Sequence, residues 1–539
     1  MNKIAFSILY SLLIVAGAGS AISAEHSGST GLYPILIISF ISIVILLVKQ
    51  EKWNWLAVAS WALLSATFFL PFLPGLNGPY PPTRFLFILS AALTFAGFRN
   101  SNTDSIKAWH YFFFLAWLVL IWARIFQLDQ RLAYGYDLAH VQNILVNTLN
   151  GRFLYSDYTG ASILTHHPFF TLAALAPIYS FFPYSITIQT IQVILLGIAV
   201  LLTTTGVKYR YGNKAAIAAF FAFFLHPSFV GQALHEFDPG VIGTLGISMI
   251  LFGFGTKNKN AMIAGAVIAA FSKELFAPSI IILSVILAVK DRKNKTAYWL
   301  FIIGLIGLAS FLTCSLLLEG QMNLKTQFAL RMAHHSDSLR EGTLFGRIGY
   351  LIHLIISQGG ISLLGWQFLI PALPEILLNL ISRFPMYYMD AHYSTLSLPL
   401  ISFAAGAGIG YLHTVKEEWA HFAMKYVCSA AILSAIFSNI GPVSHTGAFY
   451  DVFLSEPPKE IPALRALIER MPRGKVAVKG QHRLLTLLAD RNPVIDLPYI
   501  DTSKMFDERN VWVCDEYRGS VPANMKLYDQ EGETLIYVK

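Results

Sequence analysis

Residues 299–318 read WLFIIGLIGLASFLTCSLLL and contain no charged side chain. A run of about 18 or more apolar residues is typical of a helix that crosses a bilayer. Similar apolar runs occur at residues 6–18, 33–48, 56–73, 111–121, 191–203, 396–412 and 422–437. The chain is 55% hydrophobic and only 13% charged, whereas an average soluble protein is about 25% charged. These features predict an integral membrane protein that crosses the bilayer many times, and they exclude a soluble one.

The net charge of +8 comes from short clusters of Lys and Arg between the apolar runs. Such clusters mark the cytoplasmic side of a membrane protein, so we expect no nucleic-acid partner. The clusters lie at residues 49–52, 99–107, 208–214, 257–259 and 291–295. The connections at 128–170, 235–239 and 319–346 then face outward. About 13 transmembrane helices satisfy this pattern, and the short loops and few cysteines fit a bacterial inner membrane.

The sequence divides into three predicted regions. Residues 1–105 form additional N-terminal helices, of which the first is either signal-like or, as we favour, an uncleaved membrane helix. Residues 106–440 form the main membrane module, and residues 441–539 form a small extracytoplasmic α/β domain. In that domain we expect helices over 461–470 and 483–490 and strands over 475–478, 494–497 and 511–514.

Two apolar stretches of the membrane module are too short or too interrupted for a plain span. Prolines bound and interrupt residues 169–182, so we interpret this stretch as an interfacial or re-entrant helix. The sequence Ser272-Lys273-Glu274 interrupts residues 261–290, which predicts two short helices that meet near the outer surface. Irregular backbone at membrane depth needs protein or a water-filled cavity around it.

The first polar cluster opens the long outer loop at Asp137 and continues to His140. Residues three positions apart share one face of a helix. A carboxylate at this place could accept the proton of an attacking hydroxyl group. Alternatively, Asp137 could be the N-cap of a helix over residues 138–149. Spacing alone leaves both interpretations open.

Two further clusters combine histidines and carboxylates. His166 and His167 point to opposite sides of an extended segment, so they could contact an anionic group but form no metal pair by themselves. After His235, the carboxylates Glu236 and Asp238 flank a phenylalanine, and both could reach one divalent cation. The alternatives are a polar helix start for the histidines and water-exposed loop residues for the carboxylates.

Charged groups also interrupt apolar stretches, where each costs roughly 2.5–3.5 kcal/mol on insertion scales. Lys273 and Glu274 are either a local ion pair at a helix break or a phosphate-binding lysine with its neighbour. Arg383 precedes His392 and Tyr393, and an interfacial aromatic belt explains only part of that group. No nucleotide-binding or catalytic zinc motif occurs in a credible context, and the three cysteines show no pairing pattern. All the polar clusters described above, from the one at Asp137 to the one at Tyr393, are predicted on the outer face.

The order of the polar motifs is itself informative. They run from Tyr136-Asp137 through His166-His167-Pro168-Phe169, Ala176-Pro177-Ile178-Tyr179, Gln189, Phe237-Asp238-Pro239 and Lys273-Glu274 to His392-Tyr393-Ser394. This order resembles a prokaryotic polytopic membrane-protein family of unknown function that is related to the GT-C glycosyltransferases. The resemblance covers residues 110–539. It implies an all-α, GT-C-like membrane protein with a small C-terminal α/β domain.

For the wider GT-C group, the resemblance implies sugar transfer from a polyprenyl-phosphate carrier on the outer face. It implies that Asp137 is the general base or a group that positions the acceptor, and that Lys273 stands where a basic side chain can meet the donor phosphate. Glu236 and Asp238 could match a second acidic motif and hold a divalent cation. The other candidates for donor or substrate binding are Glu274, His166, His167, His235, Arg383, His392 and Tyr393. The first loop has a single acidic residue instead of an adjacent pair, which leaves metal dependence open.

Two other classes of function remain as alternatives. A transporter or flippase for lipids or glycans would place polar groups at the bilayer midplane and often show inverted repeats. Here the polar clusters lie at the outer edge and no repeat is visible. A non-catalytic protein of envelope assembly could use the C-terminal domain to bind partners. An inverting glycosyltransferase, with membrane lipids and a polyprenyl-phosphate sugar as partners, is the leading hypothesis, and the oligomeric state is not determined by the sequence.

Overall fold

The computed structural model describes most of the chain after residue 107. The described ranges are 108–165, 167–290, 292–317, 343–381, 392–437, 460–472, 474–480, 482–491, 494–495, 510–515 and 525–538. The chain divides into two compact units, residues 1–124 with 441–454 and residues 125–440 with 455–539. Of the first unit, the described part is the beginning of helix α5 (Ala108–Gln130).

Within the described ranges, four helices are long and apolar enough to cross a membrane. They are α5, α8 (Ser185–Tyr211), α14 (Lys295–Leu317) and α19 (Ser397–Val415). Two bent pairs raise this number to six if each counts as one span. α9 (Asn213–Phe224) and α10 (Pro227–Leu234) form one pair, and α17 (Thr343–Ile356) and a 3-10 helix (Ile361–Phe368) form the other.

The predicted class, a largely helical membrane protein with several spans, is therefore confirmed for the described part of the chain. The predicted number of about 13 helices is not confirmed. The predicted apolar runs at 6–18, 33–48 and 56–73 lie outside the described residues. The domain boundaries at residues 105 and 440 stay predictions.

The interrupted stretch behaves as its sequence predicts. α12 (Lys259–Ala270) ends before the break and α13 (Phe276–Lys290) begins after it. The predicted short helix over 169–182 is also present, as a 3-10 helix (Phe170–Leu175) followed by α7 (Ala176–Phe181). The Thr171 N–H donates to the Phe271 carbonyl at 3.3 Å, and the Thr171 and Ser272 hydroxyls lie 3.0 Å apart. These contacts join the short helix to the break.

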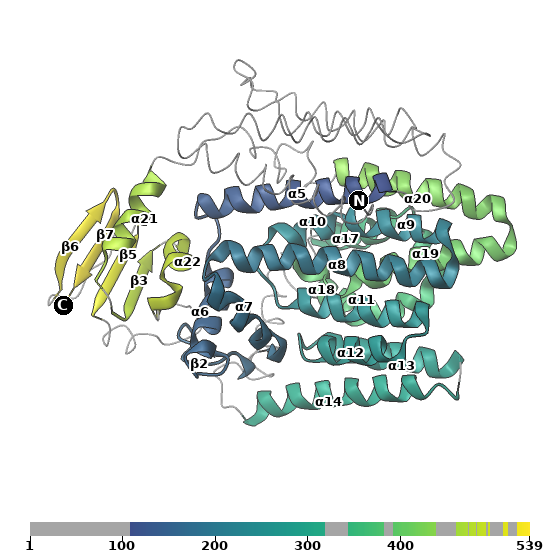
Figure 1. Ribbon diagram of the computed structural model, residues 1–539, viewed down its shortest axis with the longest axis horizontal. Coiled ribbons are helices and arrows are strands. Elements are labelled where there is room, and N and C mark those ends of the chain that lie inside the picture. The colour runs from purple at the N-terminus through teal and green to yellow at the C-terminus, as the bar shows by residue number, and fades with distance from the viewer. Residues whose placement is uncertain are drawn as a thin grey trace, which may run out of the picture. The chain divides into compact units, whose positions relative to one another are not determined.

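Helix α11 (Gly240–Thr256) packs between α8 and α12 (Figure 1). The approach is close because glycines face each other. A Cβ atom on Gly246 would lie 2.6 Å from the Gly265 carbonyl oxygen of α12, and one on Gly255 would overlap the Gly206 carbonyl group of α8. Small residues at helix contacts are typical of membrane proteins, where close backbone packing replaces the hydrophobic effect between helices.

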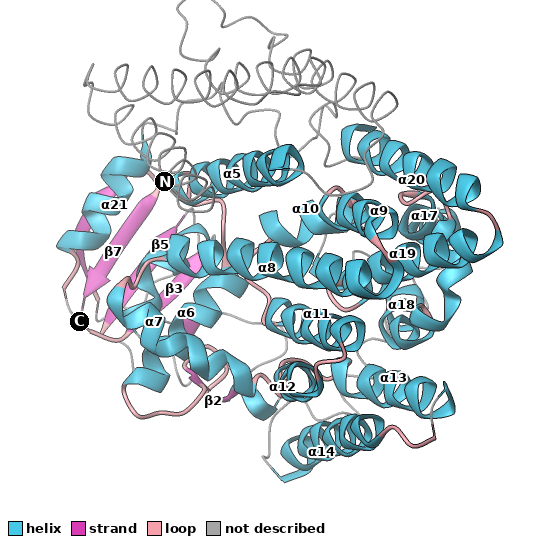
Figure 2. Cartoon of the chain, turned by 45° about the vertical axis from the view of Figure 1, so that its right-hand side comes forward, coloured by secondary structure: helices cyan, strands magenta, loops and turns pink. Residues whose placement is uncertain are grey.

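The C-terminal residues form a five-stranded sheet with the order β4-β3-β5-β7-β6 (Figure 2). The strands are β3 (Val476–Gly480), β4 (Val494–Ile495), β5 (Val511–Asp515), β6 (Lys526–Glu531) and β7 (Thr534–Val538). β3 is parallel to β4 and β5, whereas β7 is antiparallel to β5 and β6. Helix α21 (Glu460–Arg470) is present as predicted, and the predicted helix over 483–490 is split between two 3-10 turns and the short α22 (Leu485–Leu488). The β6–β7 hairpin was not predicted.

This sheet shares a hydrophobic core with helix α6 (Tyr136–Leu149) and the loop after it. Leu132, Ala139 and Tyr158 belong to the same buried cluster as residues of α21, α22, β3, β5 and β7. The Asn143 side-chain amide also donates to the Ala489 carbonyl at 3.0 Å. The C-terminal residues therefore support the helix that carries Asp137.

Replacing Gly255 with alanine is expected to lower the thermal stability of the purified protein. The added Cβ atom forces α8 and α11 apart, and overpacking of this kind costs about 1–3 kcal/mol. The matched control is Gly349→Ala on α17, where an added Cβ meets nothing within 4 Å. Thermal unfolding in detergent compares the two variants, and an unchanged midpoint for Gly255→Ala would contradict the close contact.

Candidate functional site

Helix α6 receives its N-terminal cap from a distant carboxylate. The Gly135 N–H donates to Glu236 Oε1 at 2.8 Å, and the Leu138 N–H donates to Glu236 Oε2 at 2.6 Å. The first N–H groups of a helix lack partners within it and carry partial positive charge, so a carboxylate is stabilised there. Gly135 occupies the N-cap position. The alternative interpretation of Asp137 as the N-cap is therefore wrong.

The Asp137 side chain instead presents accessible surface at the beginning of α6. Protein nevertheless surrounds it closely, and burial is the largest cause that raises the pKa of Asp137 to about 6. The negative charges of Glu236 and Asp238 act in the same direction, while His235 and Lys273 oppose them. Asp137 thus belongs electrostatically to one site with the 235–239 loop and the α12–α13 break. A carboxyl group with this pKa is mostly ionised at pH 7 and suits general-base chemistry.

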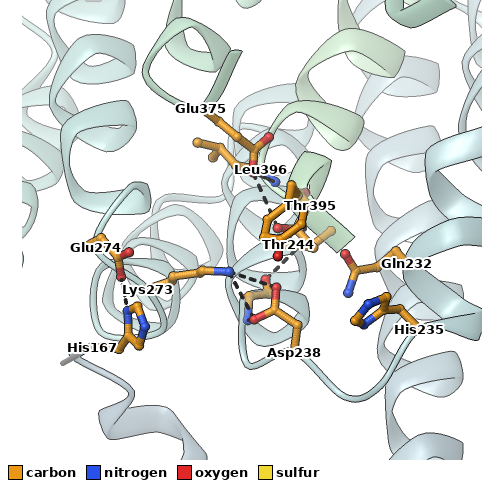
Figure 3. A network of polar contacts seen from close by, with 12 residues as sticks. His167, Gln232, His235, Asp238, Thr244, Lys273, Glu274, Glu375, Thr395 and Leu396 are labelled. Atoms are coloured by element: carbon orange, nitrogen blue, oxygen red, sulfur yellow. Dashed lines mark hydrogen bonds and ion pairs between the residues drawn. The ribbon is translucent and has the colours of Figure 1, made fainter. Parts of the chain in front are cut away.

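A buried ion pair forms the centre of the site (Figure 3). Lys273 Nζ lies 3.2 Å from Asp238 Oδ1 and 3.0 Å from Asp238 Oδ2. Asp238 Oδ1 also accepts the Gly240 N–H at 3.0 Å, at the beginning of α11. Burial by itself lowers the pKa of Lys273, but the Asp238 and Glu274 carboxylates outweigh it and hold that pKa above its ordinary value. The lysine is therefore a fixed positive charge.

Glu274 has a partner, His167, in the loop that precedes the 3-10 helix Phe170–Leu175. Its Oε2 atom lies 3.1 Å from His167 Nδ1. The His167 ring stacks on Phe169 with ring centroids 4.7 Å apart. Lys273 and Glu274, adjacent in sequence, therefore connect the break to two separate segments. His167 comes to the site from a loop that lies 107 positions before Glu274 in the sequence.

Sequence reasoning missed Glu375, which is 3% exposed on α18 (Leu373–Ile381). Its carboxylate accepts the N–H groups of Leu396 at 3.0 Å and Ser397 at 2.7 Å at the beginning of α19. The Thr395 hydroxyl donates to the same carboxylate at 3.4 Å. A single carboxylate inside an apolar stretch is costly, and that signal could have identified Glu375.

Thr395 connects Glu375 to the central ion pair. The Thr244 hydroxyl of α11 donates to the Thr395 carbonyl at 2.8 Å. A Cβ atom on Gly240 would lie 2.8 Å from Asp238 Oδ2 and 3.0 Å from Thr395 Oγ1. Glycine is needed at position 240 because the carboxylate and the hydroxyl both approach its backbone. The 235–239 loop, α11 and the beginning of α19 therefore meet at one point.

The structure brings together most of the residues predicted for the site. Asp137, His167, His235, Glu236, Asp238, Lys273 and Glu274 all lie in or around this network. The Tyr393 carbonyl accepts an amide N–H of Asn379 at 2.7 Å, in the 3-10 helix His392–Ser394. Of His392 only the backbone is described, and His166 and Arg383 lie outside the described residues.

The predicted cation site at Glu236 and Asp238 gains no geometric support. Glu236 accepts backbone N–H groups of α6, and Asp238 pairs with Lys273. Within the described ranges, no group of three or more His, Cys, Asp or Glu side chains could hold a metal ion. A divalent cation at these two carboxylates stays a prediction.

The fold has solved counterparts. One is ArnT from Cupriavidus metallidurans bound to undecaprenyl phosphate, with a TM-score of 0.55 and 11% sequence identity over 79% of this chain and 97% of that chain. Another is ArnT from the same organism in the apo state, with a TM-score of 0.50, 11% identity and the same coverage. At this identity the similarity shows the fold alone, which is the GT-C type of ArnT. Comparison with curated proteins gives no match.

A family model matches residues 127–530, which is most of the chain and includes every element of the site described above. This protein belongs to the family described as predicted membrane protein (DUF2079).

Proposed function

We propose that this protein is an inverting glycosyltransferase that takes its sugar from a polyprenyl-phosphate donor on the outer face of the bacterial inner membrane. One observation carries the proposal. An accessible carboxylate, Asp137, and a buried cation, Lys273, both belong to the site around the 235–239 loop. The ArnT-like fold supports it, because the similar ArnT structure is bound to undecaprenyl phosphate.

In the proposed reaction, the Asp137 carboxylate accepts the proton of the acceptor hydroxyl group. The hydroxyl oxygen attacks the anomeric carbon of the sugar from the side opposite the phosphate. The bond between the anomeric carbon and the phosphate oxygen breaks, and its electron pair leaves with the polyprenyl phosphate. A single displacement of this kind inverts the anomeric configuration.

Lys273 stabilises the charge that grows on the departing phosphate. An ammonium group has three N–H donors, and its two contacts with Asp238 leave one for a phosphate oxygen. The same contacts fix the position of the lysine before the substrate arrives. A charge that is already in place in a water-poor site is the usual source of large electrostatic catalysis. His167, which Glu274 orients, supplies a second polar contact for the departing phosphate, on the same side as Lys273.

The polyprenyl chain requires an apolar surface near the site. Helix α7 offers one, because Phe181 is 78% exposed and Phe182 is 63% exposed at its end. The same helix is connected to α6, since the Gln142 amide donates to the Tyr179 hydroxyl at 3.1 Å. We infer that this end of α7 faces lipid. The C-terminal sheet packs on α6, so we infer that it lies on the same outer face and contacts the acceptor.

Asp137→Asn is expected to lower kcat by about 10²- to 10⁴-fold, the usual contribution of a general base. The assay supplies purified protein in nanodiscs with a panel of polyprenyl-phosphate sugars and measures transfer or hydrolysis. The control is Asp490→Asn, the same change on a carboxylate whose side chain is 68% exposed. If the wild-type protein binds these donors and turns none over, the transport and envelope-assembly alternatives gain the advantage.

The pH profile of kcat/KM tests the environment of Asp137. A base must be ionised to act, so activity is expected to fall as the pH decreases through about 6, the pKa of Asp137. Glu236→Gln removes a negative neighbour that raises this pKa, and the acid limb is expected to move to lower pH. An acid limb near the ordinary aspartate value of about 4 in the wild-type protein would contradict the assignment.

Lys273→Met tests the phosphate contact. On its own it leaves the Asp238 carboxylate buried without its cation, and breaking a buried pair in this way costs about 3–5 kcal/mol. The double variant Lys273→Met with Asp238→Asn removes both charges and is expected to recover thermal stability. Its binding of polyprenyl phosphate, measured by thermal shift, is expected to remain lost. Normal binding by this stable double variant would exclude Lys273 as the phosphate ligand.

A further inference from the structure

Buried glutamines surround the 235–239 loop, and one of them is fully bonded. The side-chain amide of Gln192, on α8, donates to the backbone carbonyl of Gln232 at 2.8 Å and to the backbone carbonyl of His235 at 3.0 Å. Its oxygen accepts the Asp238 N–H at 3.1 Å. Gln192 therefore fixes both ends of the loop, and its role is structural.

Gln232 differs from Gln192 although both are equally buried. It is 1% exposed, and among the described residues neither its amide oxygen nor its amide nitrogen has a hydrogen-bond partner. On the facing helix, the Gln189 amide donates to the His235 carbonyl at 3.0 Å, while its oxygen has no partner within the described residues. Buried polar groups are nearly always hydrogen-bonded, so each exception requires an explanation.

These amides lie beside the central ion pair. In Figure 3 the Gln232 amide and the His235 ring extend toward Asp238 and Thr244 from one side, and Lys273 reaches Asp238 from the other. The side-chain amide of Gln192 bonds to the backbone carbonyl of Gln232 through its nitrogen and to the backbone N–H of Asp238 through its oxygen. Gln232 and Asp238 are therefore close together. A phosphate held by Lys273 would therefore place the group attached to it near Gln232.

We propose that the side-chain amide of Gln232, together with the Gln189 oxygen, binds hydroxyl groups of an uncharged sugar on the donor. This inference rests on the proposed function and names the substrate class of that site. A primary amide offers two N–H donors and one acceptor, which matches hydroxyl groups that both donate and accept.

A charged sugar fits these amides poorly. A buried ammonium or carboxylate needs an opposite charge, and a neutral amide compensates only a small part of the loss of water. The fixed charges of Lys273 and Asp238 already pair with each other. The sugar is therefore expected to carry plain hydroxyl groups on the edge that faces Gln232.

Gln232→Met tests the inference, because methionine has a similar volume and no hydrogen-bonding group. Thermal shift compares polyprenyl phosphate with polyprenyl-phosphate hexose, both in nanodiscs and without acceptor. The wild-type protein is expected to bind the hexose-bearing lipid more tightly. Gln232→Met is expected to lose that preference by about tenfold, the size of one neutral hydrogen bond, and to keep its affinity for polyprenyl phosphate.

Stability distinguishes this role from a structural one. Gln232→Met removes a buried amide without partners, so its melting temperature is expected to equal or exceed that of the wild-type protein. The matched control Gln192→Met removes an amide that is hydrogen-bonded to Gln232, His235 and Asp238 and is expected to melt lower. A lower melting temperature for Gln232→Met with an unchanged lipid preference would overturn the proposal.

The lipid pair also separates this proposal from the one on which it rests. A wild-type protein that binds both lipids equally overturns the sugar subsite and leaves the polyprenyl-phosphate site intact. A wild-type protein that binds neither lipid overturns the proposed function and the subsite with it.

Discussion

The buried ion pair between Lys273 and Asp238 is the interaction on which the arrangement of the site depends. Neither charge is stable alone away from water, so the α12–α13 break and the 235–239 loop must stay together. The loop in turn fixes the beginning of α11 through the Gly240 N–H. The same loop holds α6 through Glu236, so one short segment joins three parts of the chain.

Three carboxylates accept backbone N–H groups at helix N-termini, a role that the sequence alone did not predict for them. Glu236 caps α6, Asp238 accepts an N–H at the beginning of α11, and Glu375 caps α19. Glu236 and Glu375 are distant in sequence from the helices they cap, so these two contacts position separate parts of the chain against one another, whereas Asp238 lies two residues before Gly240. Asp137 has no such role at α6, whose N-cap is Gly135, and its side chain presents accessible surface.

The surrounding architecture makes such a polar site tolerable in a membrane protein. Close glycine contacts between α8, α11 and α12 bring their backbones together, and the breaks and bends occur where these helices end. Residues 235–239 and 271–275, where the backbone is irregular, are buried or half-buried within the protein, as irregular backbone at membrane depth must be. The C-terminal sheet completes the enclosure of α6 by sharing its hydrophobic core.

The sequence by itself determined the helical membrane class, the break at Lys273, the short helix after His167, and most of the elements of the C-terminal sheet. Those features depend on local hydrophobicity, charge and proline, which act over a few residues. The β6–β7 hairpin escaped notice although Gly532, with a φ of +57°, marks its turn. Only the tertiary structure decided that Glu236 caps α6, that Asp238 pairs with Lys273, and that Glu375 belongs to the network. These pairings join residues that are 98, 35 and 22 positions apart, and helix packing, which no local pattern encodes, sets which of them meet.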